Sequence, residues 1–150
     1  MELYDLMNKC NNYFINDYEN GDFVIQNKII ELNGTYKVNQ YIRIINSLFN
    51  DGIYKIVKID GKKIELDNGV NEEFNGYVCG LRVPNDFIKL LDKINEYEKR
   101  IKKGISSESI PNYSISYNNE DYSIVFKGEL SKYMKPYKGK FEWIKTMDMR

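Results

Sequence analysis

Four turn signals within a short stretch constrain the fold of this chain more than any other feature. They are Asn33-Gly34, Asp51-Gly52, Asp60-Gly61 and Asn68-Gly69. Each places glycine, which tolerates a positive φ, beside the Asn or Asp that tight β-hairpins favour. Short stretches typical of strands flank these turns, at 23–26, 28–32, 40–45, 53–59, 63–66 and 76–83. The sequence therefore predicts a small, mostly antiparallel β-domain of about five or six short strands over residues 21–83.

Helices are predicted on both sides of the β-domain, which gives an α+β fold. Residues 1–20 contain an amphipathic pattern that Asn20-Gly21 would end. Residues 84–104 carry the strongest helical pattern, with Pro84 suited to a first turn and Gly104 to a stop. A third helix is predicted over 119–136, ended by Pro136. Together these elements predict a single folding unit over residues 1–150.

Two segments outside the predicted core have the character of contact surfaces. Residues 105–118 form a predicted extended arm, because Tyr113, Ile115 and Tyr117 alternate with serines at the period of a strand. Residues 137–150 are a predicted docking tail, with large apolar or aromatic side chains in a segment too short for its own core. The candidate contacts in that tail are Tyr137, Phe141, Trp143 and Ile144.

Composition excludes several classes of protein. The chain holds 22 Lys plus Arg and 22 Asp plus Glu, so no bulk charge attracts it to nucleic acid or to a membrane. No apolar run approaches the ~20 residues that cross a bilayer, and the N-terminus lacks a signal pattern. We therefore expect synthesis into the cytoplasm, with Cys10 and Cys79 as reduced core residues.

Catalytic patterns are missing from the sequence. The chain has no histidine, the commonest general base and neutral metal ligand. The serines at 106–109 lack a base, and the glycines lie in turns rather than in a phosphate-binding loop. Carboxylates at Asp51, Asp60, Asp67 and Glu72-Glu73 could be a divalent-metal site, but their positions in turns favour a structural role. We expect no enzyme activity, cofactor or metal.

Several stretches, taken in order, resemble one family. They are Tyr41-Ile42-Arg43-Ile44, Asn50–Ile56, Val83–Ile88, Ser107–Tyr117 and Leu130–Met134. This order resembles the head–tail connector, or neck adaptor, proteins of tailed bacteriophages that infect Gram-positive hosts. Two features depart from the family: Pro111-Asn112 stands where a glycine is common, and the β-domain is larger than in the mostly helical connectors.

The resemblance implies a structural virion protein. About twelve copies would form a ring between the portal and the next neck or tail-terminator protein, and would line a channel through which DNA passes without sequence-specific binding. It would be located in the neck of a phage or phage-like particle, and in the host cytoplasm during assembly. Tyr113, Ile115 and Tyr117 would join neighbouring subunits by strand addition, and Tyr137, Phe141, Trp143 and Ile144 would dock on the portal. The alternative is a small monomeric β-rich module that binds a protein or peptide.

Overall fold

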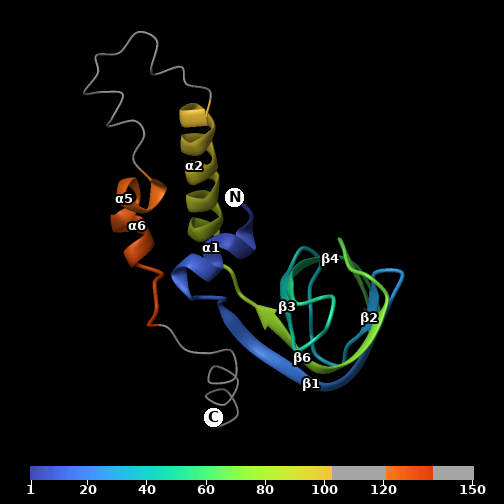
Figure 1. The fold of residues 1–150 in the computed structure, drawn as a ribbon. Coiled ribbons are helices and arrows are strands. Elements are labelled where there is room, and N and C mark those ends of the chain that lie inside the picture. Colours follow the sequence, from blue (N-terminus) through green and yellow to red (C-terminus); the bar gives the residue numbers. More distant parts are fainter. Residues whose placement is uncertain (103–120, 137–150) are drawn as a thin grey trace, which may run out of the picture. The chain divides into compact units, whose positions relative to one another are not determined.

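The structure is a computed structural model that describes residues 1–102 and 121–136 (Figure 1). It confirms an α+β fold with mostly antiparallel strands. The elements, in chain order, are α1 (Leu3–Cys10), β1 (Ile15–Gln26), β2 (Ile29–Glu31), β3 (Tyr41–Ile45), β4 (Gly52–Asp60), β5 (Lys63–Leu66), β6 (Glu72–Leu81), α2 (Asn85–Lys102), α5 (Tyr122–Val125) and α6 (Lys127–Ser131).

The packing divides the chain into two compact units. The described residues of 1–12 and 84–136 form a helical unit, and residues 13–83 form a barrel unit. The barrel is thus one continuous segment inserted between α1 and α2. In the described part of the chain, no helix is long and apolar enough to span a bilayer.

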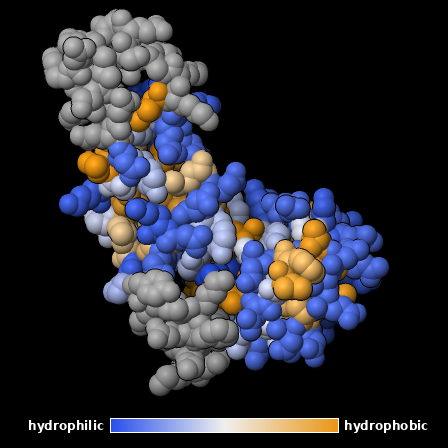
Figure 2. All heavy atoms as spheres, in the orientation of Figure 1, coloured by the Kyte–Doolittle hydropathy of each residue, from blue (hydrophilic) through white to orange (hydrophobic). Residues whose placement is uncertain are grey.

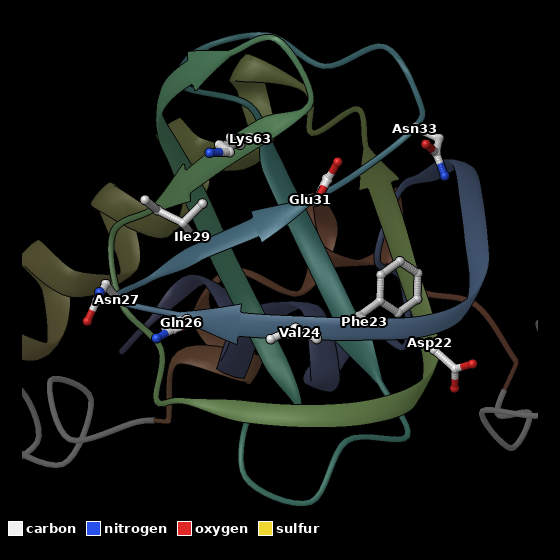
Figure 3. A pocket seen from close by; sticks show the side chains of 9 residues that line it. All are labelled: Asp22, Phe23, Val24, Gln26, Asn27, Ile29, Glu31, Asn33 and Lys63. Carbon is white, nitrogen blue, oxygen red and sulfur yellow. The ribbon is translucent and has the colours of Figure 1, made fainter.

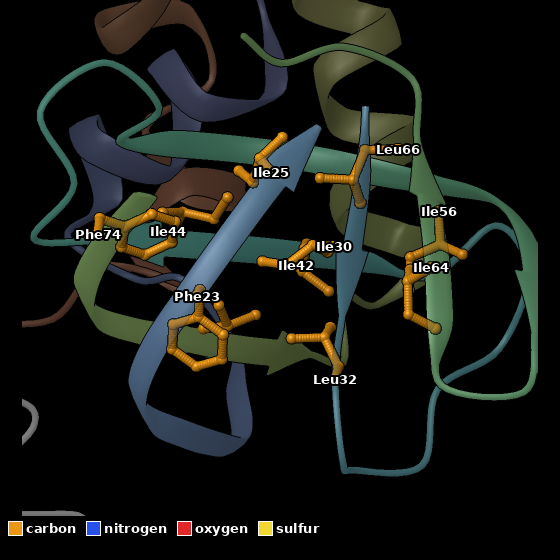
Figure 4. Packing of buried hydrophobic residues seen from close by; sticks show 11 residues of the cluster. Phe23, Ile25, Ile30, Leu32, Ile42, Ile44, Ile56, Ile64, Leu66 and Phe74 are labelled. Atoms are coloured by element: carbon orange, nitrogen blue, oxygen red, sulfur yellow. The ribbon is translucent and has the colours of Figure 1, made fainter. Parts of the chain in front are cut away.

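The β-domain closes into a barrel, which is more specific than the predicted sheet. Its strands follow the order β1-β2-β5-β4-β3-β6, and every neighbouring pair is antiparallel. The alternate residues that point inward form one core, which includes Ile25, Ile42 and Leu66 (Figure 4). Each such buried aliphatic side chain contributes ~1.5–3 kcal/mol, so this core stabilises the barrel.

The first helix is shorter than the predicted span of 1–20, and the prediction for residues 15–20 was wrong. Asn11 takes the left-handed conformation (φ 52°) and caps α1, and Phe14 also has a positive φ of 55°. The chain then enters β1, which pairs with β6 from Ile15 to Ile25. Because this long ladder binds residues 15–20 to β6, with one irregularity between Ile15 and Asp17, tertiary pairing overrides the local helical pattern.

Helix α2 confirms the strongest sequence prediction up to Lys102; Gly104 lies outside the described residues. Phe87, Leu90 and Ile94 are buried, as the three-and-four spacing predicts. Asn95 fixes the start of the chain on α2, since it accepts a hydrogen bond from the Met1 amino group at 2.8 Å and donates one to the Met1 carbonyl at 3.1 Å.

The predicted helix over 119–136 is instead two short helices, so this prediction was also wrong. The described residues form α5 and α6, separated by Phe126, whose backbone (φ −103°, ψ 22°) leaves the helical region. The Phe126 ring packs edge-on against Tyr97, with centroids 5.8 Å apart. Beyond α6, the Lys135 amide donates to the Cys10 carbonyl at 2.9 Å. This segment thus packs against α1 and α2 instead of continuing as one helix.

Arg43 is a buried charged residue in the wall of the barrel. Ile42 and Ile44 beside it point into the core, whereas Arg43 belongs to the opposite face and is still only 2% exposed. Its guanidinium carbon lies 3.5 Å from the centroid of the Tyr13 ring. Stacking on an aromatic face offsets part of the cost of burying this charge.

Candidate interaction surface

The seven residues predicted to form contacts lie outside the described part of the chain. Tyr113, Ile115 and Tyr117 belong to 103–120, and Tyr137, Phe141, Trp143 and Ile144 belong to 137–150. Their roles stay predictions. The candidate surface described below comes from the barrel and was not singled out from the sequence.

Three of the carboxylates weighed as a metal site, Asp51, Asp67 and Glu72, accept hydrogen bonds from main-chain amides. Asp51 accepts hydrogen bonds from the Ser47 amide at 2.7 Å and hydroxyl at 3.0 Å, and Asp67 accepts one from the Lys55 amide at 3.0 Å. Among the residues that the structure describes, no three His, Cys, Asp or Glu side chains gather as metal ligands would. These aspartates shape turns, as their sequence positions favour.

Three connections meet at one end of the barrel. They are the β1–β2 turn (27–28), the β3–β4 loop (46–51) and the β5–β6 loop (67–71), here called the distal loops. The Asn27 amide donates to the Asn71 side chain at 2.9 Å, and this hydrogen bond joins the β1–β2 turn to the β5–β6 loop. The chain enters and leaves the barrel at the opposite end, where Ile15 pairs with Leu81. The distal loops are therefore at the end of the barrel opposite the chain's entry and exit.

Asn50 and Glu72 hold the distal loops in one conformation. The Asn50 side chain is 1% exposed; it donates to the Val70 carbonyl at 3.0 Å and to Glu72 at 2.6 Å, and accepts from the Val70 amide at 2.9 Å. The Glu72 carboxylate accepts from the amides of Leu48 (2.6 Å) and Phe49 (3.2 Å). The bonds to the Glu72 carboxylate are charge-assisted, and together with the Asn50–Val70 bonds they fix the loop backbone.

The loops that this network fixes carry large apolar side chains that are exposed to solvent. Leu48 is 79% exposed and Phe49 is 68% exposed, and Val70 on the adjoining loop is 52% exposed. Apolar surface is sparse on the face of the barrel that Figure 2 shows, where it gathers in a small area among hydrophilic side chains. Clustered exposed apolar residues on an ordered loop are typical of a protein contact.

A second network closes the opposite end of the barrel. The Glu19 carboxylate accepts hydrogen bonds from the Asn33 amide (2.9 Å), the Gly34 amide (2.8 Å) and the Tyr36 hydroxyl (2.5 Å). Burial and then this bond to Glu19 raise the pKa of Tyr36 well above its usual range. Tyr36 therefore stays protonated and acts as a donor, which argues for a structural role rather than acid–base chemistry.

One feature of the sequence marks the distal loops as a possible contact surface once the structure is known. Leu48-Phe49 immediately precedes the turn formers Asn50-Asp51-Gly52, and two large apolar residues are unusual inside a turn. The contacts that give them their role come from Val70 and Glu72, which no local pattern links to them.

Searches against protein-family models, curated proteins and solved structures returned no match.

Proposed function

We propose that this protein is a head–tail connector that forms a ring beneath a portal, and that the distal loops are the contact which its barrel makes with a neighbouring neck protein. The observation that carries the proposal is the ordered display of Leu48 and Phe49 at the end of the inserted barrel opposite the chain's entry and exit. An assembly protein needs such a preformed apolar contact, because a fixed loop loses little entropy on binding.

The topology also supports this proposal. The resemblance to connectors is to mostly helical proteins, and here the described residues on either side of the barrel, 1–12 and 84–136, contribute to one helical unit. The barrel interrupts that unit as a single insertion between Asn12 and Pro84. An insertion leaves the helical unit to fulfil the connector role and provides an additional contact. Equal numbers of acidic and basic residues suit a channel that DNA must slide through.

A monomeric binding module is the second candidate. The distal loops favour it equally, because exposed Leu48 and Phe49 would serve a single partner as well as a ring. Oligomeric state separates the two candidates. A connector adds many copies to one portal, whereas a module binds as one copy.

Mass photometry of the full chain, alone and mixed with the portal protein encoded by the same genome, tests the proposal. We expect a ring-sized increase in the mass of the portal. A Leu48→Ser/Phe49→Ser variant should lose the next assembly step, which is binding of the following neck protein to the portal-bound ring, by tenfold or more. Loss of two exposed apolar anchors costs ~2 kcal/mol or more at an interface.

Val70 and Val38 provide a matched control. They are 52% and 51% exposed, and they lie at the distal end and the opposite end of the barrel respectively. Val70→Ser should weaken the same assembly step, and Val38→Ser should leave it unchanged. Equal effects of both changes would refute the assignment of the distal loops. A chain that ignores the portal would refute the connector and leave the binding module.

A further inference from the structure

The outer face of the barrel is protected from water over β3 and β6. Side chains alternate along a strand, so Arg43 and Ile45, which lie between and after the two core residues of β3, point outward. Cys79 pairs with Arg43 and Tyr77 pairs with Ile45, so both share this face. Arg43 and Ile45 are each 2% exposed and Cys79 is 0% exposed. We call these four residues the β3–β6 face.

The outer surface of the barrel is open to solvent elsewhere. Val24 points outward from β1, between two core residues, and is 51% exposed. It lines a hollow of about 570 Å³ that residues of β1 and β2 surround, as Figure 3 shows. The strands of a barrel cannot cover their own outer face. Another segment of chain must therefore exclude water from the β3–β6 face.

The Arg43 guanidinium is only partly satisfied within the described structure. The Tyr13 ring stacks on it, with 3.5 Å between the guanidinium carbon and the ring centroid. The buried Nε of Arg43 has no hydrogen-bond partner among the described residues. A buried charge is costly unless hydrogen bonds and an opposite charge compensate it. A segment that covers this face would therefore be stabilised by bringing a carboxylate to Arg43.

The residues that follow Pro136 begin close to this face. The Asn11 side chain donates to the Pro136 carbonyl at 2.5 Å, and Asn11 is only two residues before Tyr13, whose ring lies on Arg43. An extended run over 137–144 spans up to ~26 Å, so it can reach the whole face. Tethering gives such a segment an effective concentration of about 1 mM, which favours it over a second copy of the chain.

We propose that residues 137–148 of the same chain pack on the β3–β6 face and that the Glu142 carboxylate pairs with Arg43. The side chains that cover the face are Phe141, Trp143 and Ile144. Glu142 lies within this apolar group, and a carboxylate matches the planar donor edge of a guanidinium that includes Nε. The tail reaches a portal only by leaving this face. The inference does not depend on the connector proposal.

The fluorescence of Trp143 tests this docking in the full-length protein, because the chain has one tryptophan. We expect acrylamide to quench Trp143 threefold or more less efficiently in the native protein than in denaturant, at every protein concentration. NMR should show nuclear Overhauser effects from the Trp143 indole to Ile45 or Tyr77. Equal quenching in both states, or the absence of these effects, would overturn the proposal. Protection of Trp143 that falls on dilution would also overturn it and indicate a second copy.

A matched pair of substitutions separates the β3–β6 face from the rest of the barrel. Ile45→Asp places a charge on the face and should raise the quenching of Trp143 to the level in denaturant. Val24→Asp places the same charge on the open surface and should leave the quenching unchanged. Hydrogen exchange at Ile44 shows whether each variant keeps a folded barrel. A folded Ile45→Asp variant in which Trp143 stays protected would overturn the proposal.

A second pair tests the partner of Arg43. Glu142→Gln leaves the buried guanidinium without its carboxylate, so it should raise the quenching of Trp143 twofold or more. Asp148→Asn removes the other acidic side chain of the tail and should leave the quenching unchanged. Equal effects of the two changes would overturn the pairing of Glu142 with Arg43. Portal binding is measured separately, so failure here leaves the connector proposal intact.

Discussion

At the scale of single residues, burial sets the chemistry of the two thiols. Cys10 lies in the helical unit and Cys79 in the barrel, and both are free and buried, as the sequence predicts. Burial raises the pKa of Cys10 to about 11, against a small lowering by Lys9. Burial likewise raises the pKa of Cys79 to about 12, although the nearby Arg43 charge acts in the opposite direction. Neither thiol is a nucleophile at neutral pH.

We therefore expect both thiols to react with Ellman's reagent at pH 8 more than ~100-fold more slowly in the native protein than in denaturant, because little thiolate is present. Cys10→Ser and Cys79→Ser variants assign each signal. The folded pKa values are raised, so the thiols' contribution to stability is complete below the unfolded pKa near 9 and is lost as pH rises towards 11–12. Rapid labelling of native Cys79 would contradict this burial.

At the scale of elements, the conformation of the β3–β4 loop depends on the Asn50 side chain. Asn50→Ala removes three side-chain hydrogen bonds and leaves the Val70 amide and carbonyl without this partner. We expect a loss of about 2–3 kcal/mol in the free energy of unfolding of the barrel. We also expect weaker binding of the following neck protein, although Leu48 and Phe49 are unchanged. Chemical denaturation and mass photometry measure the two effects.

Asn68→Ala is the control for that prediction. Asn68 is exposed, and its side chain accepts a hydrogen bond only from the adjoining Gly69 amide at 2.8 Å in the described structure. Its removal should cost less than ~0.5 kcal/mol and leave binding unchanged. Equal losses from both variants would mean that any polar residue in the distal loops supports them, and that Asn50 has no special role.

The elements also divide by how much of their structure is encoded locally. Helix α2 and the Asp60-Gly61 turn between β4 and β5 were predictable, because apolar spacing and glycine act within a few residues. The hairpin predicted at Asn33-Gly34 was wrong, since β2 and β3 do not pair. The β1–β2 turn was missed, because Asn27 and Lys28 form it without a glycine.

The first half of β1 was not predictable, since its partner is β6, far along the sequence. The break at Phe126 depends on Tyr97, and the distal loops depend on Val70 and Glu72. Such pairings carry no signal in the local sequence of either partner.

At the scale of the whole molecule, the insertion makes one unit depend on the other. The chain enters and leaves the barrel side by side, because Ile15 pairs with Leu81 and the Arg82 amide donates to the Phe14 carbonyl at 2.8 Å. The folded barrel thus holds the two parts of the helical unit's chain close together. An unfolded barrel would leave them joined by a long flexible loop, whose closure costs ~2–3 kcal/mol more than that of a short one.

Unfolding of the barrel should therefore destabilise the helical unit, whereas unfolding of the helical unit should leave the barrel folded. Ile42→Ala in the barrel core and Ile94→Ala in α2 each truncate a side chain that is 0% exposed, at a cost of ~2–5 kcal/mol. We expect Ile42→Ala to lower the melting temperatures of both units. Ile94→Ala should lower only that of the helical unit, because the barrel's ladder and core lie within one continuous segment. Calorimetry, with hydrogen exchange at Ile44 and Leu90 as reporters, separates the units. Equal lowering of both by Ile94→Ala would contradict this dependence and support the single folding unit that the sequence predicts.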